Sequence, residues 1–139
     1  MTTQVIDTHE VELQKSNNRF AQRVLQADGI FELVVGTGLI LESETVARWF
    51  GSNPTLILAS GIGVLIFGGW LLYLAQHAVL RPTLQRMAVL NLAGVVVFIV
   101  LLMLDWSAIA NEGRWLIAFL ADGFVVLGLA EIYAQRNAA

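Results

Sequence analysis

The chain has 139 residues, of which 57% are hydrophobic and 14% are charged, and its formal net charge is −3. A mean hydropathy of +0.70 implies more apolar surface than a soluble domain of this length can bury. Composition therefore excludes a soluble globular protein and predicts one integral membrane domain. Cysteine is absent, which excludes disulfides, thiolate metal sites and cysteine nucleophiles.

The first 18 residues predict a polar cytoplasmic arm, and residues 19–139 predict the transmembrane domain. Residues 1–16 lack both the basic start and the apolar core of a secretory signal, so no cleavage is expected. Ser16, Asn17 and Asn18 predict a break between a short helix in the arm and the first span.

Four apolar stretches are close to the length of a membrane span. About 20 mostly apolar residues, each rising about 1.5 Å, cross a hydrocarbon core of about 30 Å. The predicted spans are about 20–41, 54–76, 83–104 and 114–134.

Capping residues mark the connections between these spans. Asn53 followed by Pro54 predicts a helix start, and Pro82 opens the third span in the same way. Residues 44–50 predict a short interfacial helix that ends at Gly51.

Basic residues are concentrated at one set of span ends. Arg48 and Arg114 lie in the first and third connections. The other six of the eight Lys and Arg residues lie before the first span, between the second and third, or after the fourth: Lys15, Arg19, Arg23, Arg81, Arg86 and Arg136. This bias predicts that both termini are cytoplasmic. The predicted fold class is therefore all-α: an integral membrane up-down-up-down four-helix bundle with a short interfacial helix after the first span.

Polar side chains occur deep inside three of the spans. Asp28 and Glu32 lie on one face of the first span, Asn91 lies in the third and Asp122 in the fourth. Counted by helical rise from the cytoplasmic ends, Asp28, Asn91, Glu32 and Asp122 lie about 8, about 10, about 13 and about 18 Å deep. These depths predict one polar cluster across three helices, and its members are the candidates for binding a ligand or a proton.

The acids of this cluster have no basic partner at the same depth. A charged carboxylate at the bilayer centre costs at least about 2.5 kcal/mol. We therefore expect at least one of Glu32 and Asp122 to be protonated at neutral pH. Protonated acids and Asn91 can hold helices together by hydrogen bonds alone, or they can form a proton relay, a cation pocket or a site for a polar headgroup.

No catalytic residue, metal site or cofactor is expected. His9 and His77 are not placed to form a bis-histidine haem site, and the acids lack the Glu-x-x-His pattern of di-iron bundles. The chain contains no phosphate loop, Ser-His-Asp set, zinc spacing or nucleotide motif, and its small net charge gives no sign of a nucleic-acid partner.

One stretch of the first span carries a resemblance to known proteins. It reads Leu-x-Ala-Asp-Gly-Ile-Phe-Glu-Leu-x-x-Gly-x-Gly-Leu-Ile, and with Asn91, Ala130-Glu131 and Arg136 it resembles small bacterial four-span proteins, loosely the DoxX-like group. The resemblance covers residues 20–136 and implies an inner-membrane protein without a catalytic residue. Small multidrug transporters are similar in length and carry an acid where Glu32 stands, but this chain has a stronger charge bias and more intramembrane acids.

We expect a non-enzymatic integral membrane protein that serves as an accessory or scaffold subunit, or that binds a lipid-like ligand, and that contains a buried acidic cluster. Its expected partners are membrane lipid and either a membrane protein complex or further copies of itself. The alternative is a small proton-coupled transporter of cationic or amphipathic molecules. A water-accessible cavity reaching the acids would favour the transporter, and a dry, packed interior would favour the subunit.

Overall fold

The computed structural model describes residues 8–104 and 106–138, with side chains from residue 11 onward. Within these ranges the ordered elements are all helices: α1 (Thr8–Leu41), α2 (Ser43–Phe50), α3 (Pro54–His77), α4 (Leu80–Leu104) and α5 (Asn111–Asn137). Helices α1, α3, α4 and α5 are each long and apolar enough to cross a membrane. The predictions of an all-α chain, four membrane-length helices and a short helix after the first are confirmed.

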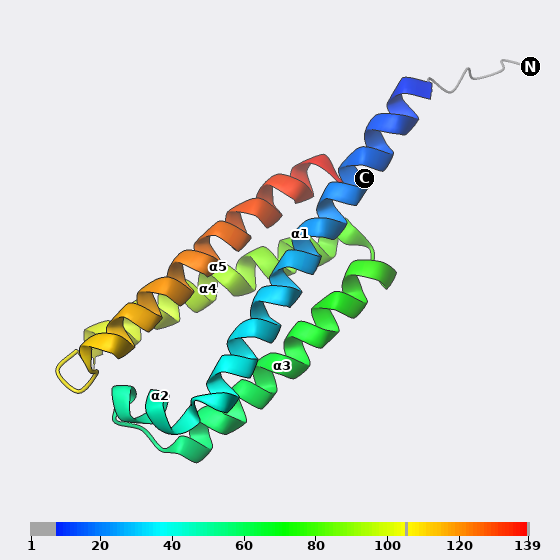
Figure 1. Cartoon of the computed structure of the whole chain (residues 1–139). Coiled ribbons are helices and arrows are strands. Elements are labelled where there is room, and N and C mark those ends of the chain that lie inside the picture. The colour runs from blue at the N-terminus through cyan, green and yellow to red at the C-terminus, as the bar shows by residue number, and fades with distance from the viewer. Residues whose placement is uncertain (1–7, 105, 139) are drawn as a thin grey trace, which may run out of the picture.

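Helix α1 differs most from its predicted bounds. It runs without interruption through Ser16, Asn17 and Asn18, so the predicted break is wrong. Ser and Asn lower helix stability by only about 0.7 kcal/mol or less per residue, which is too little to interrupt a long helix. The 34 residues of α1 extend about 51 Å, and its first turns project beyond the other helices (Figure 1). Residues 1–7 of the predicted arm lie outside the described residues.

The helix ends follow the predicted capping residues closely. The Asn53 side chain accepts a hydrogen bond from the Thr55 backbone N–H at 2.8 Å, as expected of an N-cap. Helix α2 ends at Gly51, whose φ of 57° lies in the left-handed region that favours glycine. Helix α4 begins at Leu80, slightly before the predicted start, because Pro82 can occupy the first turn of a helix, where its missing N–H breaks no bond.

The long helices form two antiparallel pairs, α1 with α3 and α4 with α5 (Figure 1). In the first pair Gly29 faces Gly68 and Gly36 faces Gly61. Residue numbers therefore decrease along α3 as they increase along α1, which is the pairing of antiparallel helices. Helix α1 also contacts α4 and α5, which makes it the element that joins the two pairs.

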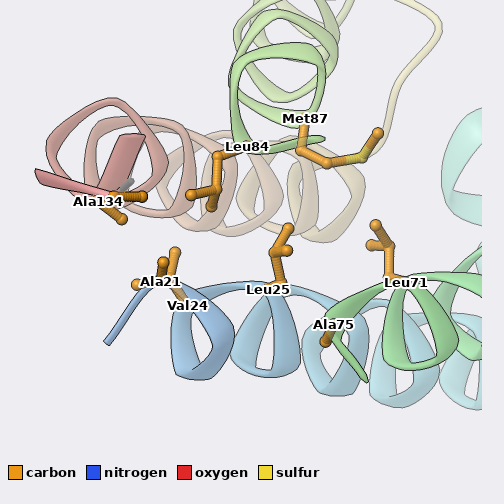
Figure 2. Packing of buried hydrophobic residues seen from close by; sticks show 9 residues of the cluster. Ala21, Val24, Leu25, Leu71, Ala75, Leu84, Met87 and Ala134 are labelled. Atoms are coloured by element: carbon orange, nitrogen blue, oxygen red, sulfur yellow. The ribbon is translucent and has the colours of Figure 1, made fainter. Parts of the chain in front are cut away.

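A hydrophobic cluster closes the bundle at the end where α5 finishes. Its buried members come from all four long helices and from the residue that follows α5: Ala21, Val24, Leu25, Leu71, Ala75, Leu84, Met87, Ala134 and Ala138. Leu25, Leu71 and Leu84 are fully buried and point toward a common centre (Figure 2). The bundle is therefore packed with aliphatic side chains at this end.

Helix α2 caps the opposite end of the bundle. Val46 and Ala47 are buried there, and the Ala110 N–H donates to the Trp49 carbonyl oxygen at 2.7 Å. This bond ties α2 to the connection between α4 and α5.

Candidate functional site

Four polar side chains are almost completely buried among the described residues. Asp28 is 1% exposed, Glu32 5%, Asn91 6% and Glu131 0%. We call these four residues the acidic cluster. Asp28 from α1, Asn91 from α4 and Glu131 from α5 meet where α1 contacts the α4–α5 pair, while Glu32, one turn after Asp28 on α1, has its Cβ against Gly68 of α3.

Asn91 bridges two of the carboxyl groups. Its Nδ2 donates to Asp28 Oδ2 at 3.3 Å and to Glu131 Oε2 at 3.0 Å. An amide nitrogen carries two hydrogens, and here each one has a separate carboxyl acceptor on a different helix. The Asn91 side chain therefore connects all three helices through one atom.

The shared donor brings two carboxyl groups close together. Asp28 and Glu131 both accept from Asn91 Nδ2, and Glu32 follows Asp28 by one turn on the same face of α1. One oxygen of each bridged acid, Asp28 Oδ1 and Glu131 Oε1, is buried without a hydrogen-bond partner. Each unpaired buried acceptor costs about 1–3 kcal/mol, and a proton on either carboxyl group would supply a donor that lowers this cost.

An aliphatic layer lies on one side of the acidic cluster along the bundle axis. It contains the hydrophobic-cluster residues Leu25, Met87 and Ala134, each about one helical turn from a cluster member. Toward α2, half-buried aromatic rings from α1, α4 and α5 pack together: Phe31 meets Phe124 with ring centroids 5.8 Å apart, and Phe98 stacks on Phe124 at 5.6 Å. Because Phe31 precedes Glu32 in the chain and also lines a surface pocket, these rings do not form a continuous layer over the acids.

The acidic cluster does not line the main surface pockets. Five pockets of about 250 to about 640 Å³ are among those that indent the described surface, and their linings include none of its four members, although Met87, one turn from Asn91, lines one of them. In the described part of the chain, no group of three or more histidine or acidic side chains is arranged to hold a metal ion.

Asp122 does not join the acidic cluster, so its predicted membership is wrong. Its side chain is exposed and lines a pocket between α1 and α5, together with Ala27 and Gly123. The error arose from the rotation of α5 about its axis, because Asp122 lies nine residues before the buried Glu131 and therefore about 180° around the helix from it. The other three predicted members, Asp28, Glu32 and Asn91, are brought together as expected.

Glu131 is the cluster member that sequence reasoning missed. Counted from Arg136, it lies about 8 Å into the fourth span, which matches the depth predicted for Asp28. Gly128 and Ala134, three residues to either side on the same helical face, are both buried. Depth and this small-residue face are the signals that identify Glu131 as inward-facing.

The triplet Ala-Asp-Gly occurs in α1 as residues 27–29 and in α5 as residues 121–123, and its glycine has a different contact in each helix. Gly29 lets the α3 backbone approach, since a Cβ there would lie 3.0 Å from the Gly68 carbonyl oxygen. At Gly123 the Phe31 ring fills the space that a Cβ would occupy.

Comparisons with protein-family models, curated proteins and solved structures find no match to this chain.

Proposed function

We propose that this chain is a non-enzymatic membrane protein that acts by holding an apolar partner, as an accessory or scaffold subunit in a bacterial inner membrane. The observation that carries the proposal is the near-complete burial of the four members of the acidic cluster, none of which lines a described pocket. A carrier must expose its acids to water on alternating sides, whereas interhelical hydrogen bonds work in a dry interior. In this proposal the cluster joins α1 to the α4–α5 pair.

In this proposal the acidic cluster is partly protonated. Two carboxyl groups facing each other repel when both are ionised and form a hydrogen bond when they share a proton. With only the neutral Asn91 amide between them, Asp28 and Glu131 retain at least one proton in the membrane. The cluster then contributes hydrogen bonds without a full complement of buried charges.

The proposed topology is up-down-up-down, with both termini in the cytoplasm. Arg19, Arg81 and Arg136 lie at the end of the bundle where α1 enters, α4 begins and α5 finishes (Figure 1). Positive charge at this end supports its assignment to the cytoplasmic side. Helix α2 then lies at the outer interface.

Transport assays separate the subunit role from the carrier alternative. We expect vesicles containing the protein to take up a fluorescent quaternary ammonium probe under an imposed pH gradient no faster than protein-free vesicles. A Glu32→Gln variant should give the same rate as the wild type. Gradient-driven uptake that disappears in Glu32→Gln would contradict the proposed function and establish carriage.

A second candidate function, holding a lipid-like chain, is favoured by one apolar cavity. It has a volume of about 260 Å³ and lies between α1, α2 and α5. Its wall includes Leu39, Trp49, Leu116 and Phe119, with Glu42 as the acidic residue of the lining. Mostly apolar walls with a single polar group are typical of sites for amphipathic ligands.

Filling this cavity should prevent lipid entry. Gly38 lines it, and a Cβ at this residue would meet no atom within 4 Å, so Gly38→Leu places a side chain in open space. In a variant with Trp49 as its single tryptophan, brominated acyl chains should quench Trp49 fluorescence, and Gly38→Leu should remove most of that quenching. Gly63→Leu is the matched control, because Gly63 is equally uncrowded but lies outside the cavity. Equal quenching in all three proteins would show that no acyl chain enters.

A further inference from the structure

Asp122 is an acid on the outer surface of the bundle, at a depth where a membrane protein would face hydrocarbon. It lies about 16 Å from the start of α5 at Asn111, which is close to the middle of a hydrocarbon core of about 30 Å. Its side chain is exposed and borders a pocket of about 370 Å³ between α1 and α5. The other residues lining this pocket are apolar, among them Ala27, Phe31 and Phe119.

This placement is energetically unfavourable for the chain alone. Ionisable side chains within membrane spans nearly always face the protein interior or water, and they pair with an opposite charge or a hydrogen-bond donor. The nearest cation on α5, Arg114, is about 12 Å away along the helix and stacks over the Trp106 ring at 4.2 Å, with a hydrogen bond to the Trp106 carbonyl oxygen. Asp122 therefore lacks a counter-charge from its own helix.

We propose that the Asp122 surface is the docking site for a transmembrane helix of another protein that carries a single Lys or Arg near its middle. This inference rests on the proposed function and adds the chemistry of the partner. Charge complementarity selects the cation, because its pairing with Asp122 removes two unfavourable groups from lipid at once. The small residues Ala27 and Gly123 leave a depression in which a second helix can approach closely.

A second copy of this chain fits the surface less well. On α1 the Lys and Arg residues all precede Asp28, and on the other described helices they lie near the helix ends, so a copy offers no cation at the depth of Asp122. A symmetric contact through α5 would instead place two Asp122 side chains together, where like charges repel.

The proposal is tested with a synthetic helix in lipid vesicles. The probe is a leucine-rich transmembrane peptide with one central lysine, and the matched peptides carry a central leucine or a central glutamate. The protein is labelled through Asn137→Cys, a specific site because the chain has no cysteine, and association is measured by energy transfer. We expect the lysine peptide to bind about 5- to 30-fold more tightly than the leucine peptide, which corresponds to an interhelical interaction of about 1–2 kcal/mol.

Variants assign this preference to Asp122. Asp122→Leu should remove it, and Asp122→Lys should transfer it to the glutamate peptide. Val97→Leu on α4, an exposed apolar position away from the pocket, should leave the preference unchanged. Because Asp122 is exposed, its substitutions are expected to leave the fold intact, and circular dichroism checks this for each protein.

The failure of this inference is distinguishable from failure of the proposed function. If the wild type binds all three peptides equally, or self-associates through Asp122 without peptide, the cation-bearing partner is ruled out while the subunit role stands. If the vesicles accumulate a quaternary ammonium probe under a pH gradient, the subunit role itself is ruled out.

Discussion

Gly68→Ala is expected to lower the free energy of unfolding by about 1–3 kcal/mol, the usual cost of overpacking. Its Cβ would lie 2.8 Å from the Gly29 carbonyl oxygen and 3.0 Å from the Leu33 backbone nitrogen. Both atoms belong to the α1 backbone, so relief requires separation of α1 from α3 and not just a new rotamer. The measurement is unfolding in detergent, followed by circular dichroism.

Gly69→Ala is the matched control for this substitution. Gly69 is the next residue along α3, and a Cβ there would meet nothing within 4 Å. Alanine also favours a helix over glycine by about 0.5–1 kcal/mol, so this variant should be as stable as the wild type or slightly more stable. Equal losses at both positions would contradict the close backbone contact of α1 with α3.

Asn91→Leu is expected to cost about 2–4 kcal/mol. The leucine removes both hydrogen bonds from Nδ2 and leaves the bonded oxygens of Asp28 and Glu131 buried without that donor, each at a cost of about 1–3 kcal/mol. The loss should appear in detergent unfolding as a lower midpoint with retained helical content. It should also increase proteolysis of the connections between helices.

Two further variants test the source of that loss. Asn137→Leu removes an asparagine bond to the Tyr133 carbonyl oxygen on the exposed surface, and it should change stability by less than about 0.5 kcal/mol. Glu131→Gln keeps a donor and an acceptor facing Asp28, so it should retain most of the stability. If Asn91→Leu were as mild as Asn137→Leu, the acidic cluster would not be holding the helices together.

The sequence predicted helix positions well, because their determinants are local. Span lengths follow from apolar composition, and the ends at Asn53 and Gly51 follow from capping chemistry. The break predicted at Ser16–Asn18 was wrong because it also rested on local sequence alone. Residues that favour caps also occur within helices, and a cap motif alone does not show whether the helix before it ends.

The acidic cluster was only partly predictable, because it depends on how each helix is rotated about its axis. Asp28 and Glu32 share a helical face, so their burial together follows from spacing alone. For α5 the inward face had to be chosen between Asp122 and Glu131. Periodicity does not make that choice in an apolar helix, since lipid and core favour similar side chains. Packing of Gly128 against Leu92 and Asn91 sets this rotation in the structure.

The infrared spectrum of the carboxyl groups, recorded before and after transfer to heavy water, tests the burial of the acidic cluster most directly. The C=O band of protonated carboxyl groups is followed in the wild type and in Glu131→Gln, which assigns the contribution of Glu131. We predict that the band of the protonated carboxyl groups persists as the external pH is changed and that their protons exchange slowly with deuterium. Added quaternary ammonium ions should leave the position and intensity of the band unchanged. A band that titrates freely, exchanges at once and responds to the cation would show that water and ligand reach the acids, and would contradict the structural role of the cluster.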